Sequence, residues 1–192
     1  MTEYMDTEIG RILANVNMNN TTVIFVSDNG SVKNGMHHSV PYRGGKTTVY
    51  EGGINVPMII AGKDVGWTGT SERLVSLTDI FNTILSIAAQ SQITNNESVS
   101  IYDYMKYGIT AGERQYVFSE YFTPNGSTNL TINRKAVIGP RYKLVHRNGF
   151  QPEFFDLVAD PFESTLVDMN NLSPNEQIEY NNLTNIINGL GL

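Results

Sequence analysis

The sequence predicts an α/β first half followed by a smaller antiparallel α+β second half, and three patterns support this prediction. An amphipathic helix leads into a continuous apolar strand within residues 3–26. A second apolar strand and another helical pattern follow over residues 56–88. In the second half, short strand-like segments surround a turn at Gly139-Pro140, which is typical of an antiparallel sheet. We therefore expect two parts, residues 1–95 and residues 96–192.

The first helix is predicted over residues 3–16. Apolar side chains recur there at helical spacing, at Met5, Ile9, Ile12, Leu13 and Val16. Residues 22–26 (TVIFV) then form a β-branched run that is apolar throughout. Continuous hydrophobicity indicates a strand buried on both faces, as in a parallel sheet. Helix, loop and buried strand form the αβ half of a βαβ unit, and because no strand precedes the helix we expect the chain to start partway through that unit.

The second strand and its helix are predicted further along. Residues 56–61 (VPMIIA) have the character of a buried strand. Residues 77–88 carry apolar side chains at helical spacing, with Ser76 or Thr78 available as the N-cap. Residues 91–100 are polar and without periodicity, which predicts a linker.

The second half is predicted to hold a small antiparallel sheet. Residues 116–121 form a short strand, and residues 136–138 and 142–145 flank the Gly-Pro turn as a hairpin. Residues 154–157 (FFDL) form a further strand.

A final helix has a clear start signal in the sequence. Ser173 is suited to the N-cap, Pro174 to the first helical position, and Glu176 completes a capping box. Gly189 is the predicted stop.

Composition excludes several classes of function. A hydrophobic content of 40% and a mean hydropathy of −0.22 are ordinary for a globular protein of 192 residues. A net charge of −6 argues against a nucleic-acid partner, because phosphate backbones select basic surfaces. No apolar run has the length of a membrane span, and the first residues lack the pattern of a signal peptide. The sequence contains no cysteine.

The residues that carry chemistry follow the first strand. Asp28 and Asn29 offer hard oxygen ligands of the kind that Ca²⁺ or Mg²⁺ prefers, and Gly30 allows a sharp turn beside them. Lys46 lies among glycines and can reach a substrate oxyanion. Together they suit a site that holds a cation and an anion, although Asp-Asn-Gly is equally common as a simple turn.

Other polar residues near this segment allow two interpretations. His37 and His38 lie between the predicted ligands and Lys46, where they either line a substrate pocket or are ordinary exposed loop residues. Arg43 and Glu51 either brace the lysine loop or form a surface ion pair.

Three consecutive motifs resemble the C-terminal half of the catalytic domain of the sulfatase family. They are residues 27–30 (SDNG), 43–46 (RGGK) and 50–57 (YEGGINVP). Flanking segments resemble the same family in the same order, so that the resemblance covers nearly the whole chain; these are residues 4–10, 78–85, 142–144 and 155–163.

The resemblance implies both a fold and a set of roles. The fold would be the C-terminal half of an alkaline-phosphatase-like α/β sandwich, over residues 1–95, followed by a small antiparallel α+β subdomain over residues 96–192. Asp28 and Asn29 match two metal ligands of the family, for Ca²⁺ or Mg²⁺, and Lys46 matches a sulfate-binding lysine. The family's nucleophile is a formylglycine made from Cys or Ser, and family members are usually secreted, periplasmic or lysosomal.

The sequence departs from the family at the nucleophile. The formylglycine motif, the first pair of metal ligands and the other catalytic residues of the family lie upstream of the matching segments, and no nucleophile is found in this chain. We expect a sulfatase part that acts on sulfate monoesters, of a small molecule or a sulfated glycan, and that is inactive alone. The alternatives are a phosphoester or phosphonate hydrolase of the same superfamily, and a non-catalytic remnant or binding module.

Overall fold

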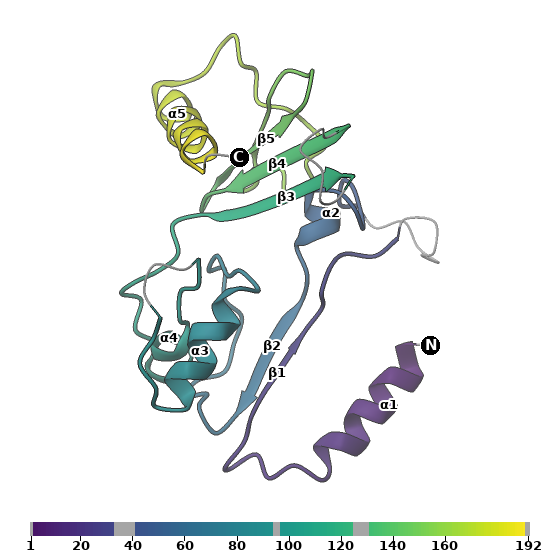
Figure 1. Cartoon of the computed structure of the whole chain (residues 1–192), viewed down its shortest axis with the longest axis vertical. Helices are drawn as coiled ribbons and strands as arrows, with labels where there is room; N and C mark the ends of the chain where they lie inside the picture. The colour runs from purple at the N-terminus through teal and green to yellow at the C-terminus, as the bar shows by residue number, and fades with distance from the viewer. Residues whose placement is uncertain (1, 33–40, 94–96, 125–130, 191–192) are drawn as a thin grey trace. The chain divides into compact units, whose positions relative to one another are not determined.

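The computed structural model describes residues 2–32, 41–93, 97–124 and 131–190 (Figure 1). The chain forms two compact units, and each is described by itself. The first unit is built from residues 1–26, 58–71 and 78–112, and the second from residues 27–57, 72–77 and 113–192. This division follows spatial compactness, and the domain boundary expected near residue 95 stays a prediction.

The first unit contains a helix and a two-stranded sheet. Helix α1, Thr2–Leu13, buries none of its side chains. Strand β1, Thr22–Val26, pairs with β2, Met58–Gly62, and Thr22 lies opposite Gly62. Helix and strands therefore form where the apolar periodicity and the β-branched runs predict them.

The surroundings of β1 differ from the prediction. We expected a strand covered on both faces in a parallel sheet, but the partner of β1 among the described residues is the antiparallel β2. Phe25 and Ile59 lie opposite each other and are 37% and 60% exposed. The physical reason is that an apolar run indicates which faces of a strand can be buried. It does not determine whether the neighbouring strand runs parallel or antiparallel.

Two helices complete the first unit, and one of them was not predicted. Helix α3, Asp79–Ile87, lies within the predicted helical segment, whereas α4, Tyr102–Tyr107, has no periodic signal of its own. The connection between them is irregular where the structure describes it, as the polar composition indicates. It is nevertheless tied to α3, because the buried Asn82 side chain donates to the Ser98 carbonyl oxygen at 2.8 Å and accepts from Ile93 N at 3.0 Å.

The second unit is centred on a four-stranded antiparallel sheet in the order β3-β4-β5-β6. The strands are β3, Val117–Thr123, β4, Ile132–Ile138, β5, Tyr142–Arg147, and β6, Glu153–Asp156. The predicted hairpin is confirmed, because β4 and β5 pair antiparallel around the Gly-Pro turn.

Both faces of this sheet are covered. On one face, the final helix α5, Pro174–Gly189, packs through Leu183 and Ile187 onto Leu144 and Phe154. On the other face, the loop residues Val49 and Tyr50 pack with side chains from three of the strands, namely Ala136, Ile138, Val145 and Phe155. The sheet therefore supports the segment that contains Lys46 and the short helix α2, Glu51–Ile54.

Local signals at the chain's last helix are also confirmed. Ser173 Oγ accepts a hydrogen bond from Glu176 N, and Glu176 Oε2 accepts one from Ser173 N at 2.7 Å, which is the predicted capping box. The helix ends at Gly189, as expected. Within the described ranges, no helix has both the length and the apolar character that crossing a membrane requires.

Candidate functional site

The predicted cation ligands lie in a tight turn directly after β1. Ser27 Oγ donates a hydrogen bond to the Asn29 carbonyl oxygen at 3.0 Å, and Asn29 Nδ2 donates to the Gly30 carbonyl oxygen at 3.0 Å. Asp28 is exposed and Asn29 is partly exposed. The local bond uses the nitrogen end of the Asn29 amide, whereas a hard cation binds the oxygen end. The turn therefore leaves the side-chain oxygens of both residues available to a cation.

Backbone hydrogen bonds join this turn to the lysine loop. Gly30 N donates to Gly53 O at 2.8 Å, and Lys46 N donates to Ser31 O at 3.0 Å. A side chain cannot be accommodated at the junction, because a Cβ on Gly30 would lie 1.9 Å from Gly52 O. The two segments that the sequence assigns to one site are thus in direct contact.

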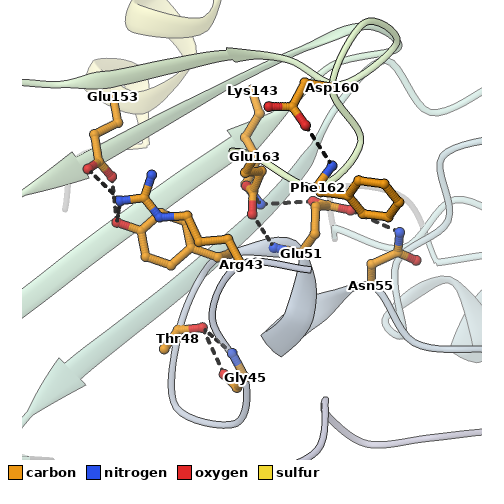
Figure 2. Close-up of polar contacts among 11 residues, drawn as sticks. Arg43, Gly45, Thr48, Glu51, Asn55, Lys143, Glu153, Asp160, Phe162 and Glu163 are labelled. Atoms are coloured by element: carbon orange, nitrogen blue, oxygen red, sulfur yellow. Dashed lines mark hydrogen bonds and ion pairs between the residues drawn. The ribbon is translucent and has the colours of Figure 1, made fainter. Parts of the chain in front are cut away.

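The backbone around Lys46 is tightly constrained. Thr48 Oγ1 accepts from Gly45 N at 3.1 Å and donates to Gly45 O at 2.7 Å (Figure 2). Thr47 has φ of +71°, a left-handed conformation that costs a β-branched residue roughly 1–3 kcal/mol. The Lys46 side chain is exposed. Its ammonium group is therefore presented to solvent from a loop whose backbone is fixed, as an oxyanion-binding lysine requires.

Arg43 anchors the start of this loop to the sheet. Its Nη2 atom lies 3.0 Å from Glu153 Oε1 (Figure 2). Its guanidinium lies over the Tyr50 ring, 4.4 Å from the ring centroid. The Tyr50 hydroxyl donates to Glu153 Oε2 at 2.5 Å, and Arg147 Nη2 lies 3.0 Å from Glu153 Oε1. Burial, and then the hydrogen bond to Glu153, raise the pKa of Tyr50 above its ordinary value. Arg43 is therefore a bracing residue rather than part of a simple surface pair.

A buried ion cluster anchors the end of the loop. Lys143 on β5 is fully buried, and its Nζ atom lies 2.8 Å from Glu51 Oε1 and 2.8 Å from Glu163 Oε1 (Figure 2). Glu163 Oε2 also accepts a hydrogen bond from Glu51 N at 2.8 Å. Burial raises the pKa of Glu163, while the Lys143 ammonium acts in the opposite direction. We refer to Lys143, Glu51 and Glu163 as the Lys143 cluster.

Lys143, Glu163 and Glu153 had no role assigned from the sequence, and Glu51, for which bracing or a surface ion pair was expected, bonds the buried Lys143. Lys143 stands in the run Tyr-Lys-Leu-Val, and a lysine inside a buried strand is a signal for a charged partner. The partners lie 92 residues away at Glu51 and on a distant loop at Glu163, so the spacing gives no indication of which carboxylates they are.

A complete cation site is not found among the described residues. No group of three or more His, Cys, Asp or Glu side chains that could hold a metal is found among them. Asp28 and Asn29 supply two oxygen donors that fit Ca²⁺ or Mg²⁺, of the six or more that such ions take. His37 and His38, the predicted substrate-lining residues, lie outside the described residues.

Comparisons with known proteins agree on one family. The family model "Sulfatase" matches residues 1–90. Mouse arylsulfatase K is 29% identical over 154 residues, covering 76% of this chain and 26% of that protein. Rat steryl-sulfatase is 35% identical over 202 aligned positions, covering 84% of this chain and 34% of that protein. The chain thus spans between about a quarter and about a third of the length of these relatives.

Solved structures agree with the sequence relatives. The phosphonate monoester hydrolase of Agrobacterium radiobacter superposes with a TM-score of 0.73 at 25% identity, over 97% of this chain and 39% of that one. The expected alkaline-phosphatase-like α/β fold is confirmed by such neighbours. The fold, the matched segments and the relatives lead to the same conclusion: the chain belongs to the sulfatase family.

Proposed function

We propose that this chain carries the cation-binding and oxyanion-binding part of a sulfate-monoester hydrolase. Asp28 and Asn29 would hold the divalent cation, and Lys46 would bind the sulfate group. The observation that supports this proposal best is the pair of backbone hydrogen bonds, from Gly30 to Gly53 and from Lys46 to Ser31, which brings the two motifs into one loop assembly.

The chemistry of these residues fits the proposed roles. Asp28 and Asn29 offer a carboxylate and an amide oxygen, which are hard donors suited to Ca²⁺ or Mg²⁺. A bound cation would act as a Lewis acid that neutralises charge on the ester oxygens. The exposed Lys46 ammonium would add a second positive charge, and its fixed backbone means that little reorganisation is needed when charge develops on the sulfate.

The substrate proposed is a sulfate monoester, either of a small molecule or of a sulfated glycan. The sequence has no cysteine, and we assign no nucleophile within it. We therefore expect this chain alone to bind the cation weakly and to leave an aryl sulfate intact. Turnover of an aryl sulfate by the purified chain would contradict that part of the proposal.

Cation binding can be tested by nuclear magnetic resonance on the ¹⁵N-labelled chain. We expect Ca²⁺ to shift the amide signals of Asn29 and Gly30 with a Kd of about 1 mM or weaker, because the proposed ligands among the described residues number only two. Asp28→Asn should abolish the shifts, whereas Asp6→Asn, at an exposed position on α1, should preserve them. Shifts that survive Asp28→Asn would contradict the assignment, and tight binding would contradict the incomplete ligand set.

Oxyanion binding needs a separate titration. With Ca²⁺ present, sodium sulfate should shift the Lys46 amide signal, and Lys46→Met should remove this response while keeping the response to Ca²⁺. If neither ion perturbs the loop assembly, a non-catalytic remnant explains the chain better.

A second candidate is a phosphonate or phosphate ester hydrolase. It is favoured by the Agrobacterium radiobacter phosphonate monoester hydrolase, which shares 25% identity over nearly the whole chain. The same Lys46 titration discriminates the two candidates. Tighter binding of methylphosphonate than of methyl sulfate would favour the phosphonate candidate, and the reverse order would favour the sulfatase.

A further inference from the structure

The turn that follows β6, residues 160–163, is held in shape by its own hydrogen bonds. Asp160 Oδ1 accepts a hydrogen bond from Phe162 N at 3.2 Å (Figure 2). Glu163 N donates to Asp160 O at 3.2 Å, and Asp160 N donates to Asp156 O at 2.8 Å, which ties the turn to the end of β6. We refer to this fixed segment of the second unit as the Glu163 turn.

The loop that carries Lys46, residues 43–52, is closed at its base. Gly52 N donates a hydrogen bond to Arg43 O at 2.8 Å, so the two ends of the loop lie side by side. Because the ends are joined, an element that holds them also sets where the loop lies, and where Lys46 lies within it.

The Glu163 turn contacts both ends of this loop. Phe162 O accepts a hydrogen bond from Arg43 N at 3.1 Å, and the Phe162 ring meets the Tyr42 ring edge-on, with 5.3 Å between the centroids. At the other end, Glu163 Oε2 accepts a hydrogen bond from Glu51 N at 2.8 Å (Figure 2). The base of the loop is therefore held by two adjacent residues of one turn.

The backbone of Glu163 indicates that its side chain is needed at this place. Its φ is +57°, in the left-handed region that glycine adopts without strain and other residues rarely occupy. The residue is only 1% exposed, and its Oε1 atom lies 2.8 Å from Lys143 Nζ. Strained conformations of this kind are kept where the surrounding structure requires the side chain. Here the carboxylate joins the buried lysine to the backbone of the loop, which a glycine could not do.

We propose that Glu163 is a positioning residue for Lys46, holding the loop in the geometry in which the lysine binds an oxyanion. This inference rests on the proposed function, because it requires that Lys46 bind the sulfate group. Glu163 is buried and therefore acts through the amide of Glu51 rather than on the anion itself. A loop that is already ordered loses less conformational entropy when the anion binds, so its affinity for the anion is higher.

The test uses the ¹⁵N-labelled full chain and two measurements. The affinity for methyl sulfate is followed through the Lys46 amide signal with Ca²⁺ present, and amide hydrogen exchange at Lys46 is measured with neither ion. Glu163→Gly suits the left-handed backbone, removes the carboxylate and leaves Lys143 paired with Glu51. We expect this variant to bind methyl sulfate about tenfold more weakly and to exchange the Lys46 amide about tenfold faster.

Two further variants separate positioning from general stability. Glu163→Gln keeps an oxygen that can accept from Glu51 N and loses the ion pair with Lys143, so it should bind methyl sulfate only about threefold more weakly than the parent chain. Leu183→Ala destabilises the same unit from the opposite face of the sheet, where α5 packs, and should leave the affinity unchanged while the unit stays folded. If Glu163→Gly does not fold, Glu163→Gln is compared with Leu183→Ala instead.

Several results would overturn the proposal. They are unchanged affinity and exchange in Glu163→Gly, an equal loss of affinity in Leu183→Ala, or a Glu163→Gln variant that binds as weakly as Glu163→Gly. A different failure is a parent chain whose Lys46 amide does not respond to methyl sulfate at all, which would refute the proposed function and with it this role of Glu163. The response of the parent chain therefore distinguishes the two failures.

Discussion

Replacing Lys143 with methionine should destabilise the second unit, because it removes the only cation of the Lys143 cluster. The side chain is fully buried and lies 2.8 Å from a carboxylate oxygen of each glutamate. Methionine fills a similar volume, so the change is chiefly one of charge. Two carboxylates, Glu51 and Glu163, then remain without the cation that neutralises them.

The size of the effect follows from opposing contributions. With an effective dielectric constant near 20, each 2.8 Å contact has a gross attraction of about 6 kcal/mol. Much of that attraction offsets the cost of removing three charged groups from water. Loss of one partner of a buried ion pair nevertheless costs ~3–5 kcal/mol, because the remaining charge stays desolvated. We expect Lys143→Met to lower the free energy of unfolding by an amount in this range at neutral pH.

The destabilisation should depend on pH in a defined direction. Burial raises the pKa of Glu163 in the folded chain. A carboxyl group with a raised folded pKa contributes stability that is complete below the unfolded pKa and is lost as pH rises through the folded pKa. Without Lys143, which lowers the pKa of Glu163, the folded pKa should rise further. The variant should therefore differ most from the parent chain at about pH 8 and much less at about pH 5.

The effect on the free energy of unfolding can be measured by urea denaturation at both pH values, for the parent chain, Lys143→Met and Lys63→Met. Lys63 is exposed, so its variant should remain within about 0.5 kcal/mol of the parent. Adding Glu51→Gln and Glu163→Gln to Lys143→Met should recover much of the loss, because no buried charge then remains. A loss below about 1 kcal/mol, an equal loss at both pH values, or failure of the triple variant to recover stability would refute the reasoning.

Three further predictions concern single contacts. Gly30→Ala should cost ~1–3 kcal/mol and accelerate amide exchange at Lys46, because a Cβ would lie 1.9 Å from Gly52 O. Gly10→Ala, where no atom lies within 4 Å of the added Cβ, is its control, and unchanged exchange at Lys46 in Gly30→Ala would contradict the prediction. Tyr50→Phe should cost ~1.5–3 kcal/mol in urea denaturation, since it removes a hydrogen bond to the Glu153 carboxylate, and a neutral effect would show that Arg43 and Arg147 satisfy Glu153 alone. Ser173→Ala should cost ~1 kcal/mol through loss of the N-cap. Hydrogen bonds from Ser173 lower the pKa of Glu176, so their contribution is present above the unfolded pKa and lost as pH falls through the folded pKa; a cost that grows in acid would contradict this.

Elements with strong local signals were predictable from the sequence. The capping box at Ser173 and the hairpin around the Gly-Pro turn rest on contacts between residues close in sequence, and both are confirmed. Helix α2 was missed because its four residues include two glycines, which disfavour helices. Helix α4 was missed because six residues are too few for a periodic pattern.

The candidate site was also predictable only in part from the sequence. Contact between the turn at Asp28 and the loop at Lys46 was inferred from their places in the sequence, and the backbone bonds agree with it. Bracing of that loop by Arg43 and Glu51 was one of two interpretations, but the partners of Glu51 could not be identified, because Glu51 lies 112 residues from Glu163 and 92 residues from Lys143. A lysine in an apolar strand indicates that a carboxylate partner exists, and only the fold identifies that partner.

The anchoring contacts have a consequence for how the site tolerates change. The bonds that hold the two loops come from Gly53, Ser31, Glu153 and Lys143, and all of these residues belong to the second unit. The exposed apolar pair on β1 and β2, Phe25 and Ile59, belongs to the first unit. Substitutions at this pair should therefore alter solubility and the stability of the first unit while the loop around Lys46 keeps its geometry. Substitutions in the Lys143 cluster should change the geometry of the loop around Lys46 and leave the first unit unaffected, because they release the loop directly.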